Sequence, residues 1–358
     1  MADKIHRYPC PGCGAELVFE PRAGALACPR CGRREEIPAS AEQVKAHSYE
    51  EYLRVRPERL APLAERALEI QCAGCGATVA FTPPTVATRC AFCGAEAVAP
   101  ARAADPVLAP GAMLPFRVAQ AQAAAAVKQW LASRWFAPGA LARMARSDAL
   151  SGVYLPFWSY DAYTVSHYTG RRGEHYWEEE RFTDRDGQVR TRQVQRTRWF
   201  PAAGTVTRWF DDVLVSGTRA LPEARLTALE PWDLAGLVAY EPAYLAGFSA
   251  QRAQLEVPEA FERAKGRMAQ EIDGDVRRDI GGDVQQVDQV ATAYSAITFQ
   301  QVLLPVWVSA YRFEGKVYQL MVNARTAEVQ GERPWSAVKI ALVVLLVVVL
   351  ALLVTWLA

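Results

Sequence analysis

The chain has 358 residues, of which 51% are apolar, so it is long enough for two or three domains and at least one substantial core. This composition excludes a disordered protein. Forty Lys and Arg residues stand against 39 Asp and Glu residues, and the resulting net charge of +1 gives no global electrostatic reason for a polyanionic partner. The first ten residues lack the apolar segment of a secretion signal, so we expect the bulk of the chain in the cytoplasm.

The first elements in chain order contain all eight cysteines. The segment CPGCGAELVF, which starts at Cys10, is repeated as CAGCGATVAF from Cys72, and both cysteine sets follow C-x2-C-x14-C-x2-C. A two-residue gap lets one tight turn direct two thiolates at the same point, and four thiolates satisfy a tetrahedral zinc ion. The sequence therefore predicts two structural Zn2+ sites in two zinc ribbons, with the ligands Cys10, Cys13, Cys28, Cys31, Cys72, Cys75, Cys90 and Cys93.

Two other interpretations of the cysteines are weaker. Structural disulfides are disfavoured in a reducing compartment, and a thioredoxin-like redox pair would occur singly, not in matched fours. Four protein ligands leave no open position on the metal, so zinc-dependent hydrolysis is not expected. Ribbons of this size cannot bury a core of their own, and we expect the metal to supply their folding free energy.

The predicted organisation is multidomain. Helix-forming residues interrupted by Pro57 and Pro62 indicate a helical spacer between the ribbons, and an Ala- and Pro-rich stretch after the second ribbon is typical of a linker. The expected segments are zinc ribbon 1 at 1–38, the helical spacer at 39–70, zinc ribbon 2 at 71–99, the linker at 100–112, an α+β domain at 113–333 and a C-terminal transmembrane helix at 336–358.

The α+β domain is expected to contain a mostly antiparallel sheet. A helix former follows Met113 and ends near Pro138, after which residues 153–216 have β character, with a hairpin turn at Asp186-Gly187 and a further strand after Pro201. Residues 257–280 predict a second helix, and residues 287–330 predict strands again.

A shorter sequence repeat occurs inside this domain. The segments YLPFWSYDAY and LLPVWVSAYRF share Leu-Pro-x-Trp followed by a tyrosine. Proline at a strand entrance followed by a large aromatic residue suggests two equivalent strands that enter one core, so Trp158 and Trp307 are expected to be core anchors. An internal duplication is a hypothesis at this point.

The predicted hairpin carries one candidate binding surface. A stripe of four arginines shares one strand face beside several aromatic residues and could follow phosphates of nucleic acid or of anionic lipids. The favoured alternative is neutralisation by three glutamates of the neighbouring strand. The arginines are Arg190, Arg192, Arg196 and Arg198, and the glutamates are Glu174, Glu178 and Glu180.

The last element is a run of 19 uncharged residues from Ile340 to Ala358. As a helix this run is about 28 Å long, close to the hydrocarbon thickness of a bilayer. Arg333 and Lys339 precede it, and Trp335 lies at the expected interface. We therefore expect a tail-anchored, single-pass protein of the inner or plasma membrane, with its N-terminal domains in the cytoplasm.

Motifs of enzymes are missing from the sequence. It contains no GxxxxGK[ST] loop, no GxGxxG after a strand, no HExxH and no GxSxG. None of the four histidines lies near an obvious nucleophile with a supporting carboxylate. We expect a protein that is not an enzyme.

Four features of the sequence together resemble bacterial membrane-anchored zinc-ribbon proteins. They are the paired CPxCG-type knuckles, both Leu-Pro-x-Trp strands, the stretch YEPAYLAGF and the segment YQLMVNARTAEVQGERPWSAVKI before the terminal helix. Members are often labelled transcription factor IIB-type zinc-ribbon proteins, or primosomal protein N′ or helicase. The resemblance implies association with phage-shock protein A and flotillin-like membrane-stress proteins. It gives the zinc-ligand role to the eight cysteines. The ATP-binding loop that a helicase needs is absent from this sequence. The family's VNGQTG-like turn reads VNARTA, without either glycine, so its geometry is expected to differ.

These observations predict a tail-anchored cytoplasmic adaptor that binds a protein partner and recruits it to the membrane. The alternative is a membrane-tethered nucleic-acid-binding protein, related to transcription or replication. Neither ribbon has the basic surface that phosphate neutralisation requires, because four glutamates offset the arginines of the first and the second has Arg89 as its one basic residue.

Overall fold

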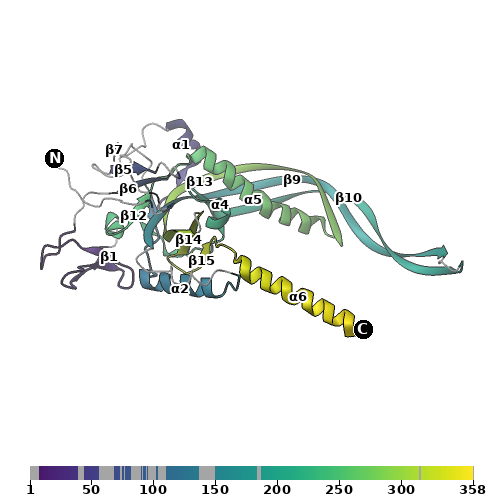
Figure 1. The fold of residues 1–358 in the computed structure, drawn as a ribbon. Coiled ribbons are helices and arrows are strands. Elements are labelled where there is room, and N and C mark those ends of the chain that lie inside the picture. Colours follow the sequence, from purple (N-terminus) through teal and green to yellow (C-terminus); the bar gives the residue numbers. More distant parts are fainter. Residues whose placement is uncertain are drawn as a thin grey trace.

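A computed structural model gives the fold of the chain (Figure 1). The residues that it describes are 8–38, 44–55, 68–72, 75, 77–81, 90, 92–93, 95, 102–103, 110–136, 150–183, 187–313 and 316–357.

Two sheets form the described β structure. The first ribbon is a three-stranded antiparallel sheet of β1 (Val18–Glu20), β2 (Ala25–Ala27) and β3 (Arg34–Glu35). A 12-stranded, mostly antiparallel sheet contains the remaining strands that the structure describes. They are β4 (His47–Ser48), β5 (Leu68–Gln71), β6 (Thr78–Phe81), β7 (Arg102–Ala103), β8 (Ala112–Met113), β9 (Ser151–Thr183), β10 (Val189–Ser216), β11 (Val238–Ala239), β12 (Ser249–Gln251), β13 (Val284–Phe313), β14 (Lys316–Asn323) and β15 (Val329–Gly331).

Helices cover parts of this sheet. The described helices are α1 (Tyr49–Val55), α2 (Gln120–Ala132), α4 (Glu223–Thr227), α5 (Val257–Ile280) and α6 (Ala337–Leu357), with short 3-10 turns η3 (Leu234–Gly236) and η4 (Pro242–Leu245). The helix predicted at 257–280 is confirmed as α5. Its apolar residues recur at helical spacing and are buried against β9, β10 and β13, because one face of the helix packs on the sheet. These residues are Val257, Ala260, Phe261, Ala264, Met268, Ile272, Val276 and Ile280.

Strands β9 and β10 form an arm that projects from the body (Figure 1). Strand β9 pairs with β10 from Phe157 to Thr183, whereas its pairing with β13 ends at Gly173. In the described part of the chain, Glu174–Thr183 therefore pairs with β10 alone, and this two-stranded end is about 33 Å long at about 3.3 Å per residue. The predicted hairpin turn includes Gly187, which has a φ of 78°. Asp186 lies outside the described residues.

The two Leu-Pro-x-Trp segments pair with each other, antiparallel, between β9 and β13. Both indoles are buried, and each donates a hydrogen bond to a backbone carbonyl just before a helix. Trp158 donates to Leu255, before α5, at 3.0 Å, and Trp307 donates to Val118, before α2, at 2.8 Å. Both tryptophans are core anchors, as predicted.

The surroundings of the two tryptophans repeat as well. Strand β12 runs parallel to β9, as β8 runs parallel to β13. After β10, the N–H of Gly217 donates to Pro156, and after β14, the N–H of Ala324 donates to Pro305, at 2.8 and 3.1 Å. The carbonyl of Gly217 in turn accepts from the N–H of Leu255, the partner of Trp158. The carbonyl of Ala324 accepts from the N–H of Val118, the partner of Trp307. The α+β domain thus consists of two equivalent units, β8–α2–β9–β10 and β12–α5–β13–β14.

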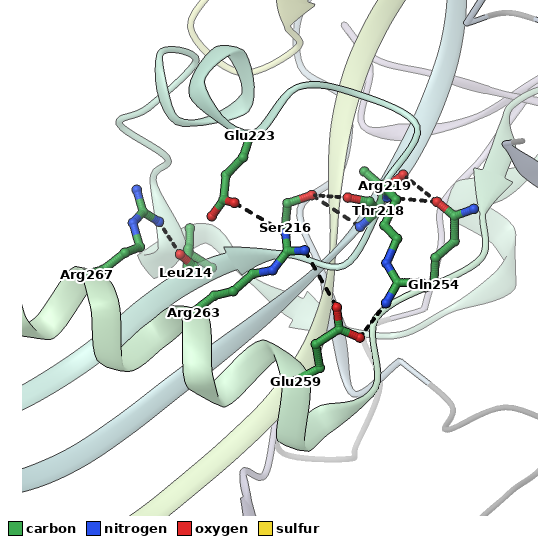
Figure 2. Close-up of polar contacts among 9 residues, drawn as sticks. All are labelled: Leu214, Ser216, Thr218, Arg219, Glu223, Gln254, Glu259, Arg263 and Arg267. Atoms are coloured by element: carbon green, nitrogen blue, oxygen red, sulfur yellow. Dashed lines mark hydrogen bonds and ion pairs between the residues drawn. The ribbon is translucent and has the colours of Figure 1, made fainter. Parts of the chain in front are cut away.

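The turn after β10 is bound to the beginning of α5 by polar side chains (Figure 2). Ser216 accepts from the N–H of Thr218 at 3.2 Å, and the Thr218 hydroxyl donates to Gln254 at 3.1 Å. Arg219 forms an ion pair with Glu259 of α5. These contacts hold one end of α5 against the sheet.

The structure differs from the sequence-based expectation in three elements. Among the described residues of the spacer expected at 39–70, only Tyr49–Val55 is helical, because His47–Ser48 pairs with β13 and Leu68–Gln71 pairs with β6 and β7. Within the expected linker at 100–112, Arg102–Ala103 is a strand. Pro57, Pro62 and Pro138 lie outside the described residues.

The third difference concerns Pro201, which does not begin a new strand. It lies inside the continuous strand β10, opposite Arg171. Proline lacks the N–H that an inner strand must donate on both sides, but β10 is an edge strand that pairs with β9 alone in the described structure. Its outer edge therefore tolerates proline. The expected fold class is nevertheless confirmed: two four-cysteine sites near the N-terminus, a mostly antiparallel sheet domain and a C-terminal apolar helix.

Candidate metal centres

The first four cysteines converge at one end of the ribbon sheet. Their sulfur atoms lie within 4.8 Å of one another. The Sγ atoms of Cys10 and Cys31 are 3.4 Å apart, and those of Cys13 and Cys28 are 3.5 Å apart. Four sulfurs at about 2.3 Å from a central ion form a tetrahedron with edges of about 3.8 Å, so this arrangement fits a tetrahedral ion.

The second four cysteines form the same arrangement. Their sulfurs also lie within 4.8 Å of one another, with 3.4 Å between Cys72 and Cys93 and 3.7 Å between Cys75 and Cys90. Each set thus forms a group that could hold one metal ion. Thiolate sulfurs are soft ligands, and tetrahedral sets of four sulfurs are typical of zinc and of iron–sulfur centres.

The same backbone turn shapes every knuckle. The N–H of each first cysteine donates to the carbonyl of the residue five positions later, at 2.7 to 2.9 Å, as for Cys10 with Ala15 and Cys90 with Ala95. Gly14 and Gly32 follow the second cysteines of the first site, with φ of 72° and 74°. Glycine tolerates this left-handed conformation, because it has no Cβ.

At each site, hydrogen bonds to sulfur lower the pKa of one cysteine, whereas the pKa of its partner, Cys13 or Cys75, is raised. The backbone N–H of Cys31 lies 3.5 Å from the sulfur of Cys28, and it is the main cause that lowers the pKa of Cys28 to about 6. The side chain of Cys75 is the main cause that lowers the pKa of Cys90 to about 5. Thiolates are the forms that bind metal, so both sites contain a ligand that is readily deprotonated near neutral pH.

The first centre is packed on the α+β domain. Phe19 of β1 forms an edge-on contact with Tyr244, at 5.2 Å between ring centroids, and its N–H donates to Ala246 at 2.9 Å. Cys10 and Cys28 belong to the same buried cluster as Trp307. The ribbon is therefore not an independent appendage.

The second centre is continuous with the large sheet. Strand β6 pairs with β12, and the side chain of Gln319 donates to the carbonyl of Phe92, between two ligands, at 2.6 Å. Cys72 and Cys90 are buried in one cluster with Leu155. The metal would thus stabilise part of the main core as well as the ribbon.

The C-terminal helix has the properties of a membrane span. Residues Val338–Trp356 of α6 form a 19-residue segment long and apolar enough to cross a bilayer, and none of it is buried in the protein. It extends away from the body (Figure 1). A helix that is apolar on every face and uncovered is unstable in water but suited to lipid.

The arginine stripe is largely neutralised, which was the favoured alternative. Arg192 lies directly opposite Glu180 and pairs with it at 2.6 Å, and Arg196 pairs with Glu178, also at 2.6 Å. Arg198 stacks over the ring of Tyr176 at 5.1 Å. The hairpin therefore presents balanced charges on this face.

The opposite face of the arm was missed in the sequence. Because pairing of β9 with β10 continues without a register shift from Thr183 to Ala162, Trp177, Trp199 and Trp209 lie on one face. All three are exposed, and α5 packs on the other face, where Tyr168 donates to Asp279. The sequence pattern that could have revealed this face lies at the odd-numbered positions of both strands, which carry mainly Trp, His, Thr and Ala.

Comparisons with known proteins give one relative of similar length. The chain is 27% identical over 340 residues, which is 94% of this chain and 92% of the relative, to the "Uncharacterized protein YdjG" of Bacillus subtilis (strain 168). No known family profile matches the chain, and no solved structure matches it. The chain is thus similar over nearly its whole length to a bacterial protein, and its two four-cysteine clusters are zinc-ribbon-like.

Proposed function

We propose that this protein is a non-enzymatic, membrane-anchored zinc-ribbon adaptor that binds a protein partner and holds it at the cytoplasmic face of the membrane. Zinc is the proposed ion at both cysteine centres, and α6 is the proposed single span. Membrane-stress proteins like phage-shock protein A or the flotillins are the proposed partners, on the basis of the sequence resemblance.

The observation that carries the proposal is the arm. One face of the arm carries the exposed side chains of Trp177, Trp199 and Trp209, and the charged residues Glu179 and Arg181 lie on the same face. The arm itself projects beyond the body (Figure 1). Tryptophan is enriched at the energetic centres of protein interfaces. The body that carries the arm contains two groups of four cysteines that could each hold a metal ion, and it leads into a helix suited to a bilayer. This arrangement displays a rigid binding surface at the membrane.

Nucleic-acid binding has less support. The arginines with the best position to follow a phosphate backbone are paired with Glu180 and Glu178. Phosphate binding would have to break these pairs.

The test is purification of the tagged full-length chain from bacterial membranes in mild detergent, with mass spectrometry, zinc quantification and a nucleic-acid assay on one eluate. The test variant is Trp199→Ser with Trp209→Ser, and the matched control is Arg192→Gln with Glu180→Gln on the opposite face. We expect two zinc ions per chain, partners that are lost in the tryptophan variant and retained in the control, and no nucleic acid.

Two results would contradict the proposal. Equal partner recovery with all three proteins would show that the face with the three tryptophans is not the binding surface. Salt-sensitive DNA or RNA in the eluate, reduced in the control variant, would favour the nucleic-acid alternative.

A further inference from the structure

The end of α2 is attached to the beginning of α6. The backbone N–H of Ser336, directly before α6, donates to the carbonyl of Phe136 at 2.8 Å. The ammonium group of Lys339, in the first turn of α6, donates to the carbonyl of Trp135 at 2.8 Å. The rings of Phe136 and Trp335 lie 6.0 Å apart. If α6 spans a bilayer, these contacts place Trp135 and Phe136 at the depth of its first turn.

The aromatic side chains at this junction are exposed. Trp135 is 63% exposed and Trp335 is 62% exposed, although large apolar side chains are normally removed from water. Tryptophan is favoured at the boundary between lipid and water, where its ring contacts acyl chains and its N–H stays hydrated. Two such residues at one depth, one after α2 and one before α6, match the aromatic belt of a membrane protein.

The charges around this junction are all positive. The sequence has no Asp or Glu between Asp105 and Asp148, and none after Glu332. Arg333 lies over the ring of Trp335 at 4.6 Å, and Arg134 precedes Trp135. Within the described parts of the chain, neither guanidinium forms an ion pair with a carboxylate. Basic groups next to a membrane span attract anionic lipid headgroups.

We propose that the turn after α2, residues 134–136, and the segment that leads into α6, residues 333–339, form one membrane-binding surface, the interfacial collar. Its aromatic rings enter the headgroup region of the bilayer, and its basic groups bind the phosphates of anionic lipids. The residues of the collar are Arg134, Trp135, Phe136, Arg333, Trp335 and Lys339. This inference rests on the proposed anchoring by α6 and adds a second contact between the body and the bilayer.

The collar has a consequence for the proposed adaptor. A span joined to a body by one flexible segment lets that body tilt freely. Here α2 packs on β14 and β15 of the sheet, and its end is attached to α6. A bilayer that binds both helices therefore fixes the orientation of the sheet, and with it the direction of the arm.

The test uses nitroxide labels on the full-length, zinc-loaded chain in phosphatidylcholine vesicles, with and without phosphatidylglycerol. Single labels replace Trp135, Trp335, Leu346 in the middle of α6, and Trp177 of the arm, which at 64% exposed is a matched control for Trp135. The unlabelled chain, in which all cysteines are metal ligands, gives the background. Collision rates with oxygen and a water-soluble nickel chelate report the depth of each label.

We expect the labels at Trp135 and Trp335 to lie at the same interfacial depth, the label at Leu346 to lie in the hydrocarbon and the label at Trp177 to lie in water. Phosphatidylglycerol should increase the depth at Trp135, and Arg134→Gln with Arg333→Gln should abolish that increase. A label at Trp135 in water with Leu346 in the hydrocarbon would overturn the collar and leave the anchor intact. Leu346 in water would overturn the anchor and the collar together.

Discussion

At the scale of single residues, the two groups of four cysteines were predictable from the sequence, whereas the turn at Val322–Ala327 was not. Ligand spacing is local and each knuckle closes within six residues, so the sequence suffices. The turn lacks both expected glycines, which suggested a changed geometry. The structure keeps a left-handed residue there: Ala327 has a φ of 66°, held by the bond from its N–H to Asn323 at 2.9 Å. Hydrogen bonds within the turn hold this conformation despite the local preference of alanine.

This strained alanine leads to a prediction. A left-handed conformation costs a residue with a Cβ about 1–2 kcal/mol. Gly avoids this cost but loses more chain entropy on folding, so a change from Ala to Gly recovers only part of it. Ala327→Gly should therefore stabilise the protein by about 0.5–1 kcal/mol. Ala228→Gly, at a residue with a φ of −68°, is the control and should destabilise it. Thermal unfolding of both variants measures the difference, and equal losses of Tm would contradict the prediction.

At the scale of elements, the long strands, the hairpin and α5 were predicted because alternation, turn residues and helical periodicity are strong in each. The spacer was not, since the pairing of His47–Ser48 and Leu68–Gln71 depends on distant strands. The strand after Pro201 was misplaced for a related reason. Proline excludes an inner strand, but the sequence does not reveal which strand forms the edge of the sheet.

The two units of the domain predict equal roles for their tryptophans. Trp158→Phe and Trp307→Phe each remove a donor and leave the carbonyl of Leu255 or Val118 without its indole partner. Each change should cost about 1–3 kcal/mol, and amide exchange should accelerate at the beginning of α5 or α2 respectively. Denaturant unfolding and hydrogen exchange check this, with Trp209→Phe on the exposed arm as the neutral control. If either variant were as stable as the unchanged protein, the two tryptophans would not have equal roles.

At the scale of the whole molecule, the sequence predicted the parts but not their assembly. Short ribbons, a spacer and a linker suggested separate domains, because cysteine spacing contains no information about what a ribbon packs against. The structure instead buries Cys10 and Cys28 beside Trp307, and Cys72 and Cys90 beside Leu155. Each ribbon thus completes its core with residues distant in the sequence. Metal binding is thereby coupled to the stability of the body.

This coupling predicts that loss of one metal ion destabilises more than one ribbon. Cys13→Ser and Cys75→Ser each remove one ligand of one centre, and each should reduce the zinc content from two ions per chain toward one. Cys75→Ser should lower the Tm of the whole sheet more than Cys13→Ser does. The reason is that the second ribbon continues the large sheet through β6 and β12, whereas the first forms a separate sheet that packs on the body without pairing with its strands. Structural zinc contributes about 10–16 kcal/mol to isolated finger peptides, which is as large as the total stability of a typical domain. Metal analysis together with circular dichroism of the full-length variants tests this order. Loss of zinc from Cys75→Ser with an unchanged transition of the sheet would mean that the second ribbon folds independently of the body.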